Sequence, residues 1–171
     1  MKVELSQKSL EEAQKQLEKF RDEYSRGVKN AVKTATEVMY NKVIDYCKAN
    51  GIHNHTSEIN WEYDEVNNVG RVYTHDKVII FNEMGTGIVG SKNPHPNPTK
   101  NFEDWEYDRN KHGEKGWRYP KGDGTYGWTR GLESRHMFYD AFMDMQKEIG
   151  NIVNIEIEKT VGDLYKGRWN I

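Results

Sequence analysis

The chain has 171 residues, which is enough for one domain with a hydrophobic core and too few for two comfortable ones. Its 25 Lys and Arg nearly balance its 27 Asp and Glu, so the net charge provides no field that would favour nucleic acid or an anionic membrane. The single cysteine, Cys47, excludes an intramolecular disulfide framework and is typical of a protein that folds in a reducing compartment.

The first residues lack the apolar segment of a signal peptide. No later stretch reaches the roughly 18 apolar residues that a membrane span needs. We therefore expect a single domain, 1–171, that is made in the cytoplasm and contacts no membrane.

Residues 9–50 have the pattern of an amphipathic helical region. Ser9 and Glu12 have the spacing of a capping box, which predicts a helix start at Ser9. Apolar residues then recur at steps of three and four, so they lie on one face. Gly51 predicts the end of the region, because glycine adopts the left-handed conformation without a steric penalty. The pattern leaves open whether Gly27 separates two helices or lies inside one.

Residues 58–84 have the pattern of antiparallel strands. Apolar and polar residues alternate over 59–64 and again over 69–73, which is the period of a half-buried strand. The run 78–81 is apolar throughout, which predicts a third, central strand that is covered on both faces. These three strands are expected to form an antiparallel meander.

Residues 91–130 contain all four prolines and three of the five tryptophans, and they lack helical or strand periodicity. Segments of this length without secondary structure are usually functional loops or disordered. The tryptophans argue against simple disorder, because disordered segments are poor in aromatic residues. We expect a long loop that orders on a partner.

Residues 134–165 form the last predicted helix, with Ser134 as its N-cap and an apolar stripe that begins at Phe138. Together the elements predict an α+β fold. In it, an antiparallel sheet of three to four strands packs against the N-terminal and C-terminal helices.

Two short motifs invite a binding role. His53 and His55 supply at most two ligands of the three or four that a metal site needs, which favours a structural or solvated role. The segment Gly85-Thr86-Gly87 has the glycines of a phosphate cradle. Neither a P-loop nor a dinucleotide-binding motif surrounds it, which favours a turn.

Hydrolytic chemistry is also poorly supported. Glu83 follows an apolar run and could be buried with a raised pKa, as a general acid requires. The sequence identifies no carboxylate partner for it, Cys47 has no neighbouring histidine, and no serine lies in a G-x-S-x-G elbow. We therefore expect no enzymatic activity, no catalytic or metal-binding residue and no cofactor.

Aromatic and basic side chains interleave in the long loop. Trp, Tyr and Arg are enriched at protein interfaces, which favours a protein partner. The same side chains could stack on sugar rings or on bases, so a binding module for glycan or single-stranded nucleic acid is the alternative. The predicted partner-binding residues are Trp105, Trp117, Arg118, Tyr119, Tyr126 and Trp128.

The stretch Phe81-Asn82-Glu83-Met84-Gly85-Thr86-Gly87 resembles the tailed-phage family typified by gene product 10 of phage HK97. Members of that family are small neck or tail-completion proteins of siphoviruses, in which a strand ends in a pattern close to E-[FY]-G-T-G. Here Met84 occupies the aromatic position of the pattern.

The order of elements in the chain is also similar to that family, over roughly residues 5–165. The loop contains the family's His-Pro pair, as Asn93-Pro94-His95-Pro96, and is longer than is usual for the family. The entry to the last helix matches less well, because His136 or Met137 stands where the family often has proline.

The resemblance implies a structural virion protein that joins head to tail, or completes the tail at the neck, by assembling into a ring. The expected partners are further copies of the chain and other neck, connector or tail-tube proteins, with no specific nucleic acid. The protein would be made in the cytoplasm of a host bacterium and would reside in the virion neck.

The turn motif itself comprises Glu83, Gly85, Thr86 and Gly87. Its glycines permit positive φ angles in a sharp turn. Glu83 or Thr86 can hydrogen-bond the backbone groups that such a turn frees. A structural role for Glu83 is therefore our first interpretation, and an inter-subunit contact is the second.

Overall fold

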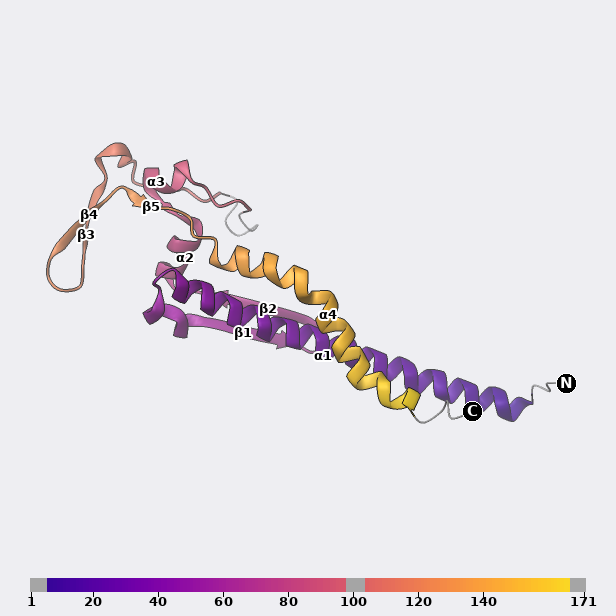
Figure 1. Ribbon diagram of the computed structural model, residues 1–171. Helices are drawn as coiled ribbons and strands as arrows, with labels where there is room; N and C mark the ends of the chain where they lie inside the picture. The colour runs from indigo at the N-terminus through magenta and orange to yellow at the C-terminus, as the bar shows by residue number, and fades with distance from the viewer. Residues whose placement is uncertain (1–5, 98–103, 167–171) are drawn as a thin grey trace. The chain divides into compact units, whose positions relative to one another are not determined.

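The computed structural model describes residues 6–97 and 104–166, with the backbone alone for 163–166. The fold class is α+β, as predicted (Figure 1). Four of the five described strands form two separate two-stranded antiparallel sheets, β1–β2 and β3–β4, and β5 lies outside both. The elements are α1 (Gln7–Ala49), η1 (His53–Glu58), β1 (Ile59–Asp64), β2 (Val69–Thr74), α2 (Lys77–Met84), α3 (Gly87–Lys92), η3 (Gly113–Lys115), β3 (Trp117–Pro120), β4 (Tyr126–Thr129), β5 (Gly131–Leu132) and α4 (Met137–Lys166).

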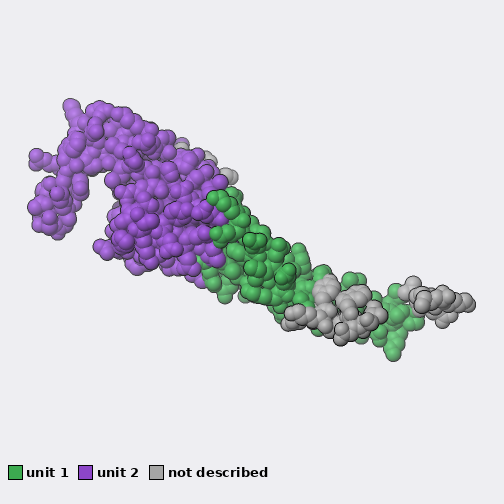
Figure 2. Space-filling model, in the orientation of Figure 1, with its two compact units in different colours: residues 1–37, 62–71, 146–171 green, residues 38–61, 72–145 purple. Residues whose placement is uncertain are grey.

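The chain divides into two compact units, which Figure 2 shows in different colours. Unit 1 comprises residues 1–37, 62–71 and 146–171, and unit 2 comprises residues 38–61 and 72–145. Each unit therefore takes part of α1 and part of α4. The single domain over 1–171 stays a prediction.

Helix α1 is one continuous helix that passes through Gly27 without a break. Its predicted start at Ser9 is wrong. The Ser6 hydroxyl accepts the Ser9 N–H at 3.2 Å and the Ser9 hydroxyl accepts the Ser6 N–H at 3.1 Å, so Ser6 is the N-cap of a reciprocal capping box. The true cap lies three residues earlier because serine at the third helical position replaces the glutamate of the usual pattern.

The end of α1 is confirmed. Gly51 has φ +78°, and the N–H of Ile52 donates to the Cys47 carbonyl at 2.9 Å. The N–H of Gly51 donates to the Lys48 carbonyl, also at 2.9 Å. This pair of bonds is a Schellman motif, which satisfies carbonyl groups that the helix leaves without partners.

Unit 1 is held together by close backbone approaches at two glycines. A Cβ atom on Gly27 would meet the Ile157 backbone of α4 at 3.1 Å, so glycine lets α1 and α4 approach there. A Cβ atom on Gly70 of β2 would collide with the Thr36 side chain of α1. Small residues at these two positions allow the helices and the strand to pack without a gap.

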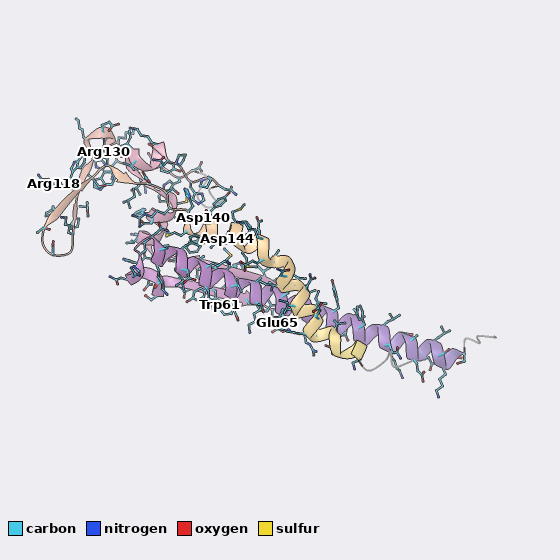
Figure 3. All side chains as sticks on the ribbon, viewed as in Figure 1. Trp61, Glu65, Arg118, Arg130, Asp140 and Asp144 are labelled. Atoms are coloured by element: carbon cyan, nitrogen blue, oxygen red, sulfur yellow. The ribbon has the colours of Figure 1, made fainter. Side chains whose placement is uncertain are left out.

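Unit 2 contains one cluster of buried apolar side chains. Helix α1 is joined to α4 in this unit by the Tyr46 hydroxyl, which donates to the Asp144 carboxylate at 2.6 Å. Figure 3 labels Asp144 and Asp140 one turn apart on α4. The buried cluster consists of Val43, Cys47, Ile52, Ile59, Ile79, Met137 and Ala141.

The predicted third strand is wrong, because residues 78–81 lie in helix α2. Asp76 is the N-cap of this helix, and its carboxylate accepts the Ile79 N–H at 3.0 Å. Ile79 is fully buried, whereas Val78 and Phe81 are about two-fifths exposed, at 40% and 42%. A short apolar run does not distinguish strand from helix by its period, and here the cap decides the outcome. The predicted three- to four-stranded sheet is therefore absent from the described residues.

The segment 91–130 is more structured than the predicted loop. It contains η3 and the antiparallel β3–β4 hairpin, which pairs Trp117 with Thr129 and Pro120 with Tyr126. The prediction missed these strands because each has only four residues, too few to display a period. Residues 98–103, with Pro98, lie outside the described residues.

A helix that spans a membrane needs a stretch of roughly 18 or more apolar residues. Within 6–97 and 104–166, no helix contains a sufficiently long apolar stretch.

Candidate functional site

The carboxylate of Glu83 caps helix α4 from outside that helix. Its Oε2 accepts the N–H of Phe138 at 2.9 Å, and its Oε1 accepts the N–H of Tyr139 at 3.1 Å. These are the second and third residues of α4, whose N–H groups have no partner within the helix. A negative charge at this end is also favourable to the helix dipole. Glu83 therefore holds the start of α4 against the end of α2.

His95 is the third hydrogen-bond partner of this carboxylate. Its Nε2 lies 3.0 Å from Glu83 Oε1, and only 4% of the His95 side chain and 13% of the Glu83 side chain are exposed. The N–H of Asn97 donates to His95 Nδ1 at 3.1 Å, so Nδ1 is an acceptor and the neutral ring carries its proton on Nε2. The ring therefore donates to Glu83. The sequence pattern does not assign His95 to Glu83, although the His-Pro pair that follows the turn motif is a signal for this contact.

The glycines of the turn motif are required by their backbone conformation and by close contacts. Gly85 has φ +80° and Gly87 has φ +61°, in the left-handed region. A Cβ atom on Gly85 would meet the Ser134 nitrogen at 2.8 Å, and one on Gly87 would collide with the Arg130 carbonyl. Thr86 pairs with Leu132 of β5 through an antiparallel bridge, and its hydroxyl accepts the Leu132 N–H at 3.2 Å.

The turn therefore joins the end of α2 to the segment before α4 and to the segment that contains Trp105. The Ser134 hydroxyl donates to the Glu83 carbonyl, and the Arg135 N–H donates to the Asn82 carbonyl at 2.7 Å. On another side, the Trp105 indole donates to the Gly85 carbonyl at 2.9 Å. These contacts give Glu83, Gly85, Thr86 and Gly87 an intrachain structural role. The inter-subunit contact of Glu83 stays a prediction.

An open pocket of about 970 Å³ lies beside the turn, and we call it the aromatic pocket. Its walls include Phe81 of α2 and Trp105, whose rings lie 6.0 Å apart between centroids. The ring of Trp117 of β3 lies against the ring of His112, and the two ring centroids are 5.0 Å apart. The aromatic side chains that line the pocket are Phe81, Trp105, Tyr107, Trp117 and Tyr119.

One wall of the aromatic pocket carries acidic side chains. The run Asp104-Trp105-Glu106-Tyr107-Asp108 alternates carboxylates with rings, and all five residues line the pocket. Asp108 is engaged locally, because its carboxylate accepts the N–H of His112 at 2.9 Å and that of Gly113 at 2.7 Å. These bonds lower the pKa of the Asp108 carboxyl. Asp104 and Glu106 are exposed. The sequence itself shows this alternation, and it is the signal by which the acidic wall could be predicted.

The β3–β4 hairpin has two different faces. Cross-strand partners in an antiparallel pair point to the same side, and neighbours along a strand point to opposite sides. Trp117 and Tyr119 face the aromatic pocket, and the Tyr119 ring lies across Gly127, where a Cβ atom would meet it at 2.6 Å. We call the opposite side the outer face. It carries Arg118, Pro120, Tyr126 and Trp128.

The outer face is strongly exposed. Tyr126 is 68% exposed and Trp128 is 59% exposed. The Trp128 ring is nonetheless held in place, because its indole N–H donates to the Lys115 carbonyl at 3.1 Å. Figure 3 shows Arg118 on this hairpin, directly opposite Trp128 in the register. The structure thus divides the predicted partner-binding residues: Trp105, Trp117 and Tyr119 line the pocket, whereas Arg118, Tyr126 and Trp128 lie on the outer face.

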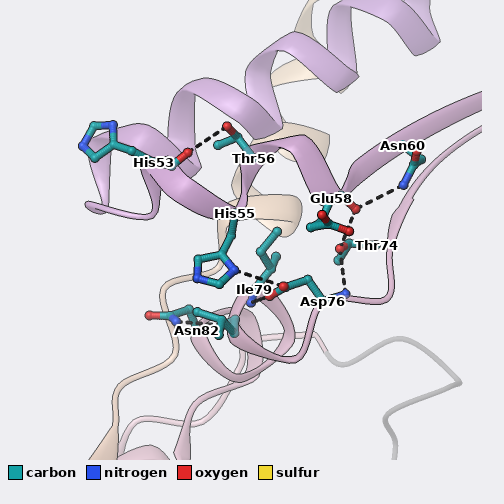
Figure 4. A network of polar contacts seen from close by, with 10 residues as sticks. His53, His55, Thr56, Glu58, Asn60, Thr74, Asp76, Ile79 and Asn82 are labelled. Atoms are coloured by element: carbon teal, nitrogen blue, oxygen red, sulfur yellow. Dashed lines mark hydrogen bonds and ion pairs between the residues drawn. The ribbon is translucent and has the colours of Figure 1, made fainter. Parts of the chain in front are cut away.

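Of the two histidines near the start of β1, His55 has a structural contact, and His53 is exposed. His55 Nδ1 lies 3.0 Å from the Asp76 carboxylate, in the polar network of Figure 4. Burial raises the pKa of the Asp76 carboxyl, but hydrogen bonds from the Ile79 N–H and from His55 lower it further than burial raises it. Among the described residues, no group of three His, Cys, Asp or Glu side chains is placed to hold a metal ion.

Cys47 belongs to the core of unit 2. Its side chain is fully buried, and burial together with the nearby Glu83 charge raises the pKa of the thiol from 9.0 to about 11. The thiol therefore stays protonated at neutral pH, whereas a nucleophile requires the thiolate.

The chain matches no protein-family model, no curated protein and no solved structure.

Proposed function

We propose that this protein is a structural virion protein of a tailed bacteriophage, which joins head to tail or completes the tail at the neck by assembling into a ring. The observation that carries the proposal is the β3–β4 hairpin. It exposes Tyr126 and Trp128, at 68% and 59%, beside Arg118. Large rings next to arginine are the side chains that dominate protein interfaces.

The turn motif supports the same proposal through the resemblance to the neck family. In this chain Glu83 caps α4, and Gly85 and Gly87 allow the backbone to pass close to residues 130–134. A motif of this kind positions parts of a scaffold relative to one another. It anchors the hairpin to the body of unit 2, as a subunit in a ring requires.

We propose no catalytic activity, because the candidate acid and the candidate nucleophile of this chain, Glu83 and Cys47, are both held in structural positions. Both carboxylate oxygens of Glu83 accept hydrogen bonds within the chain. The Cys47 thiol is buried and protonated. Function would then depend on complementary surfaces between subunits and with connector or tail-tube proteins.

Particles made without this protein test the proposal. The expected result is filled heads and complete tails that remain separate under the electron microscope, with joining restored by the wild-type gene in trans. The control is restoration by a gene with the helix substitution Gly150→Ala, where an added Cβ meets nothing within 4 Å. Intact, infectious particles in the absence of the protein would refute the proposal.

The second candidate is a binding module for glycan or single-stranded nucleic acid. The observation that favours it is the outer face, where an arginine and two rings could stack on sugars or bases. A binding screen with Trp128→Ala and Trp117→Ala discriminates between the candidates. Sugar or single-strand affinity that Trp128→Ala removes would support the binding module, and the absence of such affinity in the wild-type protein would exclude it.

A further inference from the structure

The hairpin's outer face and the aromatic pocket have complementary chemistry. The outer face offers Tyr126, Trp128 and the guanidinium of Arg118. The pocket offers aromatic walls and the exposed carboxylates of Asp104 and Glu106. Among the described lining residues, the three carboxylates outnumber the two basic side chains, Arg109 and His112. The pocket therefore suits an aromatic segment that carries an arginine.

A chain cannot fill its own aromatic pocket with its own outer face. Trp117 and Tyr119 of β3 already face that pocket. Because side chains alternate along a strand, Arg118 points to the other side of the same hairpin. Trp128 pairs with Arg118 and Tyr126 pairs with Pro120, so both rings lie on the same side as Arg118. Turning the outer face into the pocket would remove Trp117 and Tyr119 from its wall. The two surfaces can meet only between two molecules.

We propose that the outer face of one copy docks in the aromatic pocket of a second copy. Tyr126 and Trp128 insert among the rings of the pocket, and Arg118 pairs with the carboxylates of Asp104 and Glu106. An Arg–carboxylate pair fixes orientation as well as adding attraction, since the guanidinium presents a planar fork of donors. The volume of about 970 Å³ lies within the range of pockets that enclose a ligand.

The proposed contact is heterologous, because it joins two different surfaces. A pair of copies keeps one unoccupied outer face and one unoccupied pocket, so further copies add head to tail until a rotation closes the ring. The inference rests on the ring assembly proposed above and identifies which surfaces meet in it.

Charge reversal with rescue tests the contact. Sedimentation velocity over a concentration series measures association of the wild-type chain, of Arg118→Glu and of the double variant Asp104→Lys/Glu106→Lys. Each reversal is expected to raise the dissociation constant at least about 30-fold, as for loss of a hot-spot charge pair worth about 2 kcal/mol. Combining all three changes in one chain is expected to restore association. Lys33→Glu makes the same charge change as Arg118→Glu on an exposed position of α1 and is expected to leave association unchanged.

Mixing separates a heterologous contact from a symmetric one. Trp128→Ala disables the outer face, and Asp104→Lys/Glu106→Lys disables the pocket. The intact pocket of the first variant can receive the intact outer face of the second, so the mixture is expected to stop at one-to-one dimers. A wild-type chain that stays monomeric up to about 1 mM, where even contacts of about 4 kcal/mol would register, overturns the inference. Failure of the triple variant to regain association also overturns it.

The same variants distinguish this inference from the proposed function. Particles that join normally with Arg118→Glu, while particles without the protein do not join, would overturn the contact and leave the neck function standing. The opposite outcome would support the contact and overturn the neck function: the charge variants change association in solution as expected, but heads and tails join normally in particles without the protein.

Discussion

The imidazole of His95 and the carboxylate of Glu83 lie 3.0 Å apart and are almost completely buried. The carboxylate also accepts two N–H groups from the first turn of α4. One side chain thus connects α2, the segment after α3 and α4. Each of its three partners is a hydrogen-bond donor. Removal of the carboxylate would leave all three donors without their acceptor, and each lost bond lowers the free energy of unfolding.

Glu83→Ala is expected to destabilise the protein by about 3 kcal/mol, because two backbone donors and the His95 donor lose their acceptor. Glu83→Gln is expected to cost less, since its amide oxygen still accepts one of these bonds. Urea unfolding followed by circular dichroism measures both changes. Glu62→Gln, at an exposed position paired with Arg71, is the control and is expected to stay within about 0.5 kcal/mol of wild type. Equal stabilities of Glu83→Ala and the control would contradict the capping role.

Gly87→Ala is expected to lower the free energy of unfolding by more than about 2 kcal/mol, because the new Cβ would collide with the Arg130 carbonyl and φ is +61°. Gly150→Ala lies in α4 with open space around the new Cβ. It is expected to stabilise the protein by about 0.5–1 kcal/mol, because alanine has the higher helix propensity. Thermal unfolding of the two variants gives opposite signs. A neutral Gly87→Ala would show that the close approach is not required.

The pH dependence of stability is expected to include a contribution from Asp76. Its pKa is lowered in the folded state, so the charged form is favoured there. The stabilisation is present above the unfolded pKa of about 3.9 and is lost as pH falls through the lower folded value. Asp76→Asn keeps a side chain that can cap α2 but removes the charge, so the acid limb of the stability curve becomes flatter. Asp76→Ala also loses the cap and is expected to cost a further 0.5–2 kcal/mol, roughly. Urea unfolding between pH 3 and pH 7, in steps of about one unit, measures both effects.

Cys47 is expected to resist thiol reagents in the native protein. Its side chain is fully buried and its pKa is raised to about 11, so little thiolate exists and none of it is accessible. Colorimetric thiol titration at pH 8 should show full reaction only after denaturation. With a folded pKa above the unfolded one, the stability from the buried thiol is present below pH 9.0 and is lost as pH rises toward 11, roughly. Rapid labelling of the native protein would contradict the buried position.

Hydrogen exchange is expected to distinguish the hairpin in free and assembled protein. The amides of β3 and β4 should exchange faster in the free chain than those around Val43, and they should become protected in the particle. Protection in the free chain equal to that of the core would contradict a segment that orders on its partner. Protection unchanged by assembly would contradict the proposed interface.

Several elements could be predicted from the sequence because their signals are local. The end of α1 at Gly51 follows from glycine's left-handed conformation, and β1–β2 follows from the alternation of residues over 59–64 and 69–73. By contrast, the apolar run 78–81 carries no period of its own. The Asp76 cap and the burial of Ile79 make it helical. The cap is a local signal that the apolar pattern does not contain, whereas the burial depends on the surrounding structure.

The candidate site shows the same division. The turn could be predicted from its glycines, because positive φ angles favour glycine. An interface in 91–130 could be predicted from the aromatic residues, because protein interfaces are enriched in large rings. The sequence could not assign Glu83 to the start of α4, a partner 55 positions away. Nor could it separate Trp117 from Arg118, which are adjacent in the chain but face opposite sides.

The sequence by itself thus determined the α+β class, the end of the long N-terminal helix and the turn that needs glycine, since each depends on neighbouring residues. Only the tertiary structure decided that Glu83 is a helix cap, that His95 is its partner and that the hairpin has two faces. Hydrogen bonds and pockets of this kind form between segments far apart along the chain, and no local pattern specifies which segments will meet.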